Sequence, residues 1–204
     1  MSSANKILRI TVLVSGNGSN LQAIIDAIES GKLKNAKVVH VLSDNASAYG
    51  LERAKNYDIP TTIITSTDFA DGRDRNRAYV EAITNEPTDL IVLAGFLSII
   101  PKPSVKLHQG KMINIHPSLL PKYGGKGCYG IKVHEQVIEA GETETGATVH
   151  YVSPEVDAGE VIIQRKVDVK PADTPQILQA RVMEVEHDII IKAIEIFQKE
   201  RGFI

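Results

Sequence analysis

Apolar residues in the first half of the chain gather in short continuous runs that are rich in β-branched side chains. Runs of this length, bounded by turn residues, predict strands that are buried on both faces. Strands are therefore expected at residues 7–14, 38–42, 61–64, 90–94 and 112–115.

Between these runs, apolar side chains recur at three- and four-residue spacing, which is the period of a helix with one buried face. The clearest example is the series Leu21, Ile24, Ile25 and Ile28, which ends at a Ser-Gly pair. Helices are expected at residues 21–30, 46–56 and 73–84.

The C-terminal part of the chain follows a different pattern. Residues 147–152 and 161–167 predict two strands, and the turn residues between them indicate a hairpin-like pair. A long helix follows, with Thr174 as its N-cap, Pro175 in its first turn, and a broad apolar stripe that continues to residue 199. The pair of strands is expected to extend the sheet that the first half begins.

Strands that alternate with helices predict an α/β fold of the Rossmann-like kind. Its sheet is mostly parallel, with helices on both faces and right-handed crossover connections. The antiparallel C-terminal strand pair and the long C-terminal helix complete this expectation. A length of 204 residues lies between one large domain and two small ones.

Composition and charge exclude several classes of protein. Apolar residues make up 43% of the chain and charged residues 24%, which is ordinary for a globular protein with its own core. A net charge of −2 gives no support for binding nucleic acid or an anionic membrane. The single cysteine, Cys128, excludes intramolecular disulfides and cysteine-based zinc sites, and no metal site is expected. The start of the chain, residues 1–6, lacks the apolar region of a secretory signal, so we expect a cytoplasmic location.

The polar residues at the end of the expected strand 112–115 are the strongest candidates for catalysis. Side chains two positions apart on a strand share a face, so Asn114 and His116 should project together before Pro117 ends the strand. An amide can donate to a developing oxyanion, and an imidazole can carry a proton. The alternative is a simple turn with a satisfied histidine.

Residues 15–20, Ser-Gly-Asn-Gly-Ser-Asn, form a turn between the first strand and the first helix. Glycines there allow an anion to approach the backbone, and the helix N-terminus offers free N–H groups. The segment is neither a Walker A loop nor a G-x-G-x-x-G motif, because Leu21 occupies the third glycine position. It predicts a phosphate site, and tight packing is the alternative explanation for its glycines.

Three further positions are weaker candidates on pattern alone. Asp157 lies in the loop between the last two expected strands, and its carboxylate would raise the pKa of His116 if that loop folds over the sheet. The segment 95–100 follows a buried strand with apolar residues that suit a flat heteroaromatic ligand, although it could be ordinary core. Glu186 lies on the long helix, where an acidic residue is usually solvated.

Taken together, these motifs resemble the phosphoribosylglycinamide formyltransferases of purine synthesis. The resemblance covers residues 10–195, and its specific parts are residues 15–24, 94–96, 114–121 and 156–159. The histidine motif also occurs in methionyl-tRNA formyltransferases and formyltetrahydrofolate hydrolases, which carry an additional domain. The resemblance implies a single formyltransferase domain over 1–204, with a phosphate-binding half at 1–100 and a catalytic and folate-binding half at 101–204.

The resemblance also implies residue roles. Asn114, His116 and Asp157 match the catalytic trio. The ribonucleotide would be bound by Gly16, Asn17, Gly18, Ser19, Asn20 and Glu186. The folate would be bound by Arg73, Leu97, Ser98, Ile99, Ile100 and Asn114, with Arg75 as the alternative to Arg73.

Two departures from the family pattern stand out. Ser98 occupies a position where many relatives have arginine, so the pocket wall loses a cation there. The segment between Tyr123 and His134 is several residues longer than in bacterial relatives, and Cys128 within it receives no role by analogy.

The function implied is formyl transfer from 10-formyltetrahydrofolate, as co-substrate, to the amine of phosphoribosylglycinamide. Asn114 and protonated His116 would stabilise the oxyanion of a tetrahedral intermediate, with Asp157 supporting the histidine. The expected partners are these small molecules, with no nucleic acid, membrane or metal, and the protein is expected to be a monomer or homodimer. A formyltetrahydrofolate hydrolase is the alternative within the family. A nucleotide-dependent oxidoreductase and a silent binding protein are the alternatives outside it.

Overall fold

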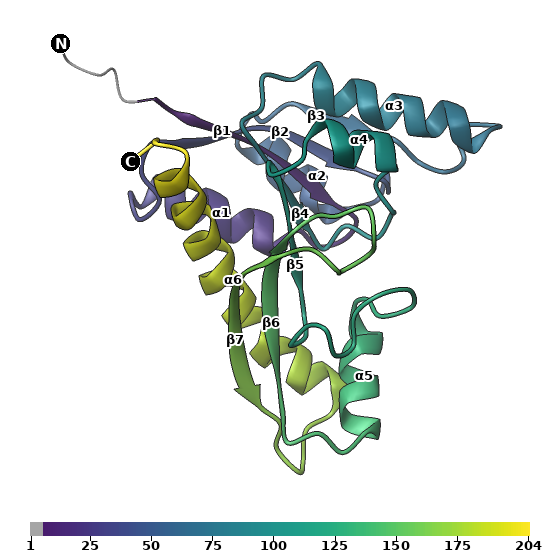
Figure 1. Ribbon diagram of the computed structural model, residues 1–204, viewed down its shortest axis with the longest axis vertical. Coiled ribbons are helices and arrows are strands. Elements are labelled where there is room, and N and C mark those ends of the chain that lie inside the picture. The colour runs from purple at the N-terminus through teal and green to yellow at the C-terminus, as the bar shows by residue number, and fades with distance from the viewer. Residues whose placement is uncertain (1–5) are drawn as a thin grey trace.

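A seven-stranded sheet with the order β3-β2-β1-β4-β5-β6-β7 forms the centre of the structure (Figure 1). The computed structural model describes residues 6–204, so the expectation about the signal sequence rests almost entirely on residues outside the described part. The strands are β1 (Leu8–Val14), β2 (Ala36–Ser43), β3 (Thr61–Ile63), β4 (Leu90–Ala94), β5 (Met112–His116), β6 (Glu144–Tyr151) and β7 (Val161–Asp168). The first five strands pair with one another in parallel, whereas β6 is antiparallel to both β5 and β7.

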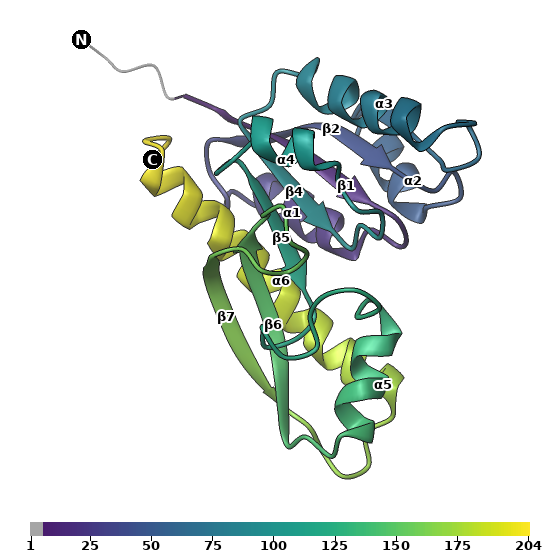
Figure 2. The same ribbon diagram turned by 45° about the vertical axis from the view of Figure 1, so that its right-hand side comes forward.

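Helices cover both faces of this sheet (Figures 1 and 2). They are α1 (Ser19–Glu29), α2 (Tyr49–Asn56), α3 (Gly72–Thr84), α4 (Lys102–Leu107), α5 (Ile131–Glu139) and α6 (Pro175–Glu200). Helix α6 packs against α1, α5, β6 and β7, so the end of the chain joins the first helix to the last strands. The expected α/β class, the antiparallel strand pair and the long final helix are all confirmed.

The alternation of side chains along the strands explains why their apolar runs are continuous. In β1, Val12 packs in the larger core with α1 and α6, whereas the adjacent Leu13 packs in the smaller core with Tyr79 and Ile83 of α3. Successive strand residues point to opposite faces, and here each face is covered by helices. Both positions must therefore be apolar, which is the pattern that the sequence shows.

Two short helices were not predicted. Helix α4 has only six residues and contains a proline in its first turn, so it is too short to show a helical period. Helix α5 follows a glycine-rich segment directly, and its buried residues Val133, His134 and Val137 include a histidine. A mixed face of this kind hides the apolar period that would otherwise indicate a helix.

Helix α6 begins as the sequence predicts. The Thr174 hydroxyl accepts a hydrogen bond from the Ile177 N–H at 3.3 Å, and Pro175 occupies the first turn.

None of the helices between residues 6 and 204 combines the length and apolar character needed to cross a bilayer.

Candidate active site

The loops that follow β1, β4 and β5 meet at one edge of the sheet, because parallel neighbouring strands all end there. Hydrogen bonds join the first two of these loops directly. The Ser15 N–H donates to the Gly95 carbonyl at 3.2 Å, and the Ser15 hydroxyl accepts from the Leu97 N–H at 2.8 Å. The expected phosphate turn and the expected folate segment are therefore tied together although about eighty residues separate them in sequence.

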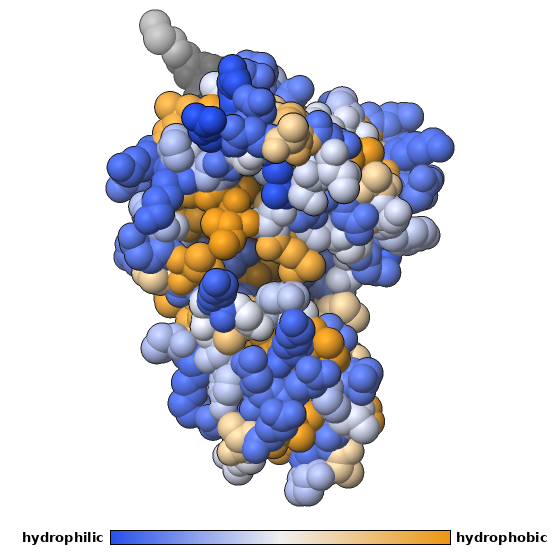
Figure 3. Space-filling view, turned by 90° about the vertical axis from the view of Figure 1, so that its right-hand side faces the viewer, coloured by the Kyte–Doolittle hydropathy of each residue, from blue (hydrophilic) through white to orange (hydrophobic). Residues whose placement is uncertain are grey.

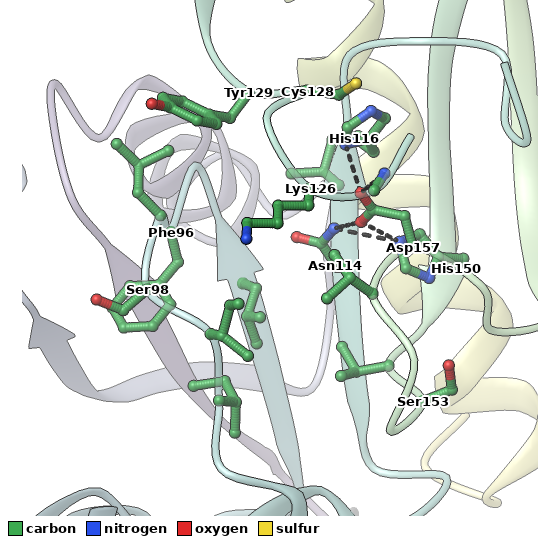
Figure 4. A pocket seen from close by; sticks show the side chains of 18 of the residues that line it. Phe96, Ser98, Asn114, His116, Lys126, Cys128, Tyr129, His150, Ser153 and Asp157 are labelled. Atoms are coloured by element: carbon green, nitrogen blue, oxygen red, sulfur yellow. Dashed lines mark hydrogen bonds and ion pairs between the residues drawn. The ribbon is translucent and has the colours of Figure 1, made fainter. Parts of the chain in front are cut away.

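Asn114 and His116 lie on β5 with their side chains on the same side of the strand, as predicted. The antiparallel neighbour β6 places His150 directly opposite Asn114. The Asn114 amide nitrogen lies 3.1 Å from His150 Nε2 and 3.4 Å from Asp157 Oδ1 (Figure 4). His150 Nδ1 is 2.9 Å from the Tyr151 carbonyl, which can only accept, so the proton of a neutral His150 lies on Nδ1. His150 Nε2 is then free to accept from Asn114.

The loop after β6 folds back and brings Asp157 to the two histidines. Asp157 Oδ2 lies 3.6 Å from His116 Nδ1, and Oδ1 lies 3.6 Å from His150 Nε2. The backbone N–H of Gly125 donates to Oδ2 at 2.8 Å. The condition stated in the sequence analysis is therefore met, because this loop folds over the end of the sheet and brings Asp157 close to His116.

Burial dominates the electrostatics of His116, whose side chain is only 6% exposed. Its Nε2 lies 2.8 Å from the Tyr123 carbonyl. Burial lowers the pKa of His116, and although Asp157 and the Tyr123 carbonyl raise it, the net pKa remains below the usual value. The sequence-based expectation of a raised pKa is thus wrong in net direction, because it considered the neighbouring charge and not the loss of water.

The pKa of Asp157 shifts in the direction that favours its charged form. Burial raises this pKa, but contacts with His150, His116 and the Gly125 N–H together lower it below the usual value. A carboxylate that accepts several hydrogen bonds in a confined site stays ionised at neutral pH. Asp157 therefore supplies a negative charge next to Asn114 and His116 before substrates bind.

A cavity of about 290 Å³ opens in front of this cluster. Apolar side chains gather around a hollow on this face of the molecule (Figure 3). Leu97, Ser98, Ile99 and Ile100 line the cavity, as the folate prediction requires, and Leu97 and Ile99 remain 56% and 71% exposed at its wall. A partly open apolar wall of this kind suits a flat ring system that is buried when it binds.

The structure favours Arg75 over Arg73 as the arginine near this wall. Arg73 pairs with Asp71 and its side chain is 91% exposed, away from the cavity. Arg75 donates from Nη2 to the Ser98 hydroxyl at 2.7 Å and to the Tyr79 hydroxyl at 3.1 Å. The guanidinium of Arg75 therefore lies next to Ser98, the position at which the family resemblance implies an arginine in many relatives.

The predicted phosphate turn ends at the N-terminus of α1, where Gly18 is the N-cap with a φ of 72°. A Cβ at Gly18 would lie 2.7 Å from the Gly50 Cα, so tight packing also requires this glycine. Arg53 donates from Nε to the Asn17 carbonyl at 2.9 Å and from Nη2 to the Asn17 side-chain oxygen at 3.0 Å. The turn is thus held rigidly beside a cation that the sequence analysis did not identify.

Glu186 lies next to this turn and is largely removed from water. The Asn20 amide donates to Glu186 Oε2 at 3.2 Å, and burial raises the pKa of Glu186 to about 7. Glu186 therefore departs from the usual solvated position of an acidic residue on a helix. Ser19 also faces α6, with its hydroxyl 3.4 Å from the Met183 sulfur of that helix.

His150 and Lys126 also line the cavity, although the sequence motifs give neither residue a role. The signal for His150 was its place on the strand opposite Asn114, which becomes visible only when the register of β5 and β6 is known.

Residues 8–194 match the sequence profile of the family described as Formyl transferase. The chain is 42% identical over 193 residues to a phosphoribosylglycinamide formyltransferase of Haemophilus influenzae, an alignment that covers 95% of this chain and 88% of the relative. A solved phosphoribosylglycinamide formyltransferase from Coxiella burnetii, in complex with CHES, has 46% identity and a TM-score of 0.83, covering 92% of this chain and 85% of that one. Glycinamide ribonucleotide transformylase 1 from Symbiobacterium toebii has 34% identity and a TM-score of 0.90, covering 98% and 92%. The chain therefore belongs to the formyl transferase family, within the group of the phosphoribosylglycinamide formyltransferases.

Proposed function

We propose that this enzyme transfers the formyl group of 10-formyltetrahydrofolate to the amine of 5'-phosphoribosylglycinamide in de novo purine biosynthesis. The observation that carries the proposal is the meeting of Asn114, His116 and Asp157 at the wall of an open apolar cavity. An amide and an imidazole beside a carboxylate suit a reaction that creates negative charge on oxygen. The apolar wall suits the pterin ring of the donor.

The reaction begins when the lone pair of the neutral amine attacks the formyl carbon. The carbonyl π electrons move to oxygen and form a tetrahedral oxyanion. When the carbonyl reforms, the bond between carbon and N10 breaks and its electron pair remains on N10. The attacking nitrogen loses one proton and N10 gains one, so the products are the formamide and tetrahydrofolate.

Asn114 and His116 would stabilise the oxyanion, and a single good donor in such a site contributes roughly 3–4 kcal/mol. Burial favours neutral His116 in the unliganded protein. A developing negative charge on the substrate oxygen favours the imidazolium, and the carboxylate of Asp157 acts in the same direction. His116 would therefore become charged when the intermediate forms, with protons passing through Asp157 and water.

The turn at residues 16–20 would bind the phosphate of the ribonucleotide. Backbone N–H groups at the start of α1 point outward from a positive helix end, and Glu186 lies close enough to Asn20 to contact the rest of the nucleotide. Binding energy from the remote phosphate would position the amine at the reacting carbon.

We propose a single domain over 1–204, two small-molecule substrates, no metal cofactor, no nucleic-acid or membrane partner, and a cytoplasmic location. Within residues 6–204 no group of three or more histidine, cysteine, aspartate or glutamate side chains is arranged to hold a metal ion. A monomer and a homodimer are both compatible with the proposed site.

The function is tested by the absorbance change of 10-formyltetrahydrofolate deformylation, with and without phosphoribosylglycinamide. We expect turnover only when the ribonucleotide is present, with stoichiometric formation of the formylated product. Equal turnover without the ribonucleotide would identify a hydrolase instead. No turnover in either case would refute the proposed activity.

The placement of the two ligands is tested by the double substitution Ser19→Ala with Asn20→Ala. These side chains lie at the phosphate turn and not at the cavity. We expect the KM for the ribonucleotide to rise by about tenfold or more, because one to two hydrogen bonds to a charged group are lost. A rise in the KM for the folate, with an unchanged KM for the ribonucleotide, would show that the two ligands are placed the wrong way round.

A further inference from the structure

Lys126 brings a positive charge into the catalytic cavity from a loop that the proposed mechanism does not use. Its side chain lines the cavity together with Asn114 and Phe96, and its amine points into the space between the β5 end and the loop after β4 (Figure 4). In the described part of the chain, its amine forms no ion pair or hydrogen bond with another residue. An ammonium group without a protein partner is available to a ligand.

The other polar donors at this wall are already engaged. The Asn114 amide nitrogen has two hydrogens and two acceptors in place, His150 Nε2 and Asp157 Oδ1. His116 faces the Tyr123 carbonyl with one ring nitrogen and Asp157 with the other. The donors predicted to hold the oxyanion must therefore exchange a protein partner for the substrate, whereas Lys126 need not.

The charge balance of the cavity points to the same residue. The acidic side chains on its walls are those of Asp157 and Glu155, and burial keeps the pKa of His116 below its usual value. Among the lining side chains within residues 6–204, Lys126 is the only lysine or arginine. Without Lys126, the imidazolium of His116 alone would have to offset both the anionic intermediate and the Asp157 carboxylate.

The backbone of the loop connects Lys126 to the catalytic carboxylate. Gly125, directly before Lys126, donates its N–H to Asp157 Oδ2 at 2.8 Å. Gly125 and Gly127 both have positive φ angles, 88° and 91°, which other residues adopt only with strain. The turn on each side of Lys126 therefore depends on glycine, and its attachment to Asp157 directs the lysine to the reacting centre.

We propose that Lys126 is a further catalytic residue, whose ammonium group donates a hydrogen bond to the formyl oxygen and stabilises the oxyanion of the tetrahedral intermediate. This role rests on the proposed function. Lys126 retains its proton throughout. The π electrons of the carbonyl move to oxygen beside the ammonium group and return when the bond to N10 breaks, while the proton lost by the amine goes to N10 by the route through His116, Asp157 and water.

The test compares Lys126→Met and Lys126→Arg with the control Lys106→Met, which removes an exposed lysine of α4 outside the cavity. We expect Lys126→Met to lower kcat by about 10- to 100-fold, less than the 10²- to 10³-fold usual for a buried oxyanion donor, because the lysine is exposed to water. The KM values for both substrates should change by less than about threefold, since the interaction forms mainly in the transition state. Lys106→Met should match the unaltered enzyme.

Lys126→Arg separates a catalytic charge from a structural role of the loop. It keeps the cation, so its kcat should exceed that of Lys126→Met by about tenfold, although the planar guanidinium is not an exact replacement. Equal losses in both variants, together with a lower melting temperature, would identify a structural role and overturn the proposal. Unchanged kcat in Lys126→Met would do the same, as would a rise in one KM with kcat intact, which would assign Lys126 to substrate binding.

The unaltered enzyme is assayed first with and without the ribonucleotide. If the unaltered enzyme shows no ribonucleotide-dependent turnover, both the proposed function and the role of Lys126 are refuted. Normal turnover of the unaltered enzyme combined with normal turnover of Lys126→Met would refute the role of Lys126 alone.

Discussion

Asp157→Asn is expected to lower kcat by about 10²- to 10³-fold, the usual effect of losing one electrostatic contribution to an oxyanion site. The side chain keeps its shape but loses the charge that favours protonated His116. The Asp157 carboxylate lies 3.6 Å from His116 Nδ1, with its side chain only 10% exposed, so water screens this interaction weakly. His116→Ala should cause a loss of similar size. The double variant should lose little more than either single one, because the two residues act as a unit.

The pH profile of kcat distinguishes the loss of the Asp157 charge from simple damage to the fold. Asp157 raises the pKa of His116, so removing its charge lowers that pKa further. If the protonated histidine is required, kcat falls as pH rises through the pKa of His116 in the substrate complex. That fall should move to lower pH in Asp157→Asn.

The control is Glu160→Gln, which removes an exposed carboxylate from the same loop three positions later. It should leave both kcat and its pH profile unchanged. Near-normal turnover of Asp157→Asn or of His116→Ala, measured with saturating substrates, would contradict the roles proposed for these residues.

Gly159→Ala is expected to abolish most activity without touching a proposed catalytic side chain. A Cβ at Gly159 would lie 1.7 Å from the Tyr151 carbonyl oxygen, which is far inside van der Waals contact. That carbonyl also accepts from His150 Nδ1. The backbone must therefore move, and the movement would displace both Asp157, two residues earlier, and His150.

We expect Gly159→Ala to reduce kcat by at least about 10²-fold, because small displacements of catalytic groups have effects of this size. The free energy of unfolding should fall by about 1–3 kcal/mol, the usual cost of overpacking. Urea unfolding and steady-state kinetics would measure the two effects.

Gly72→Ala provides the matched control, because a Cβ at Gly72 would meet no atom within 4 Å. Activity and stability of this variant should be normal. Unaltered activity of Gly159→Ala would show that the loop at residues 153–159 can move without consequence, and that Asp157 is not needed at its observed position.

Much of the fold follows from local patterns in the chain. The sequence predicts strand β4 with its observed bounds, Leu90–Ala94, because a short continuous apolar run is typical of a parallel strand that is buried on both faces. The start of α6 was predicted from Thr174 and Pro175, which act through the neighbouring backbone alone. The shared direction of Asn114 and His116 follows from the period of a strand.

Helices α4 and α5 required tertiary information. Six residues do not show a helical period, so α4 gives no signal of its own. Helix α5 follows a glycine-rich segment and packs against α6. The local sequence pattern does not predict this contact. Such elements are stabilised by the surface they pack on more than by their own propensity.

The candidate site likewise combines features that the sequence predicts with features that only the tertiary structure determines. The sequence by itself determined which residue types are present at the strand ends, and its motifs indicated the family. The tertiary structure alone decided that Asp157 reaches Asn114 across 43 positions, that His150 joins them, and that Lys126 enters the cavity. It also decided the electrostatics, because burial outweighs Asp157 in setting the pKa of His116 and raises that of Glu186 to about 7. Spacing along a chain specifies local direction, whereas distances between loops and exclusion of water depend on how distant segments pack.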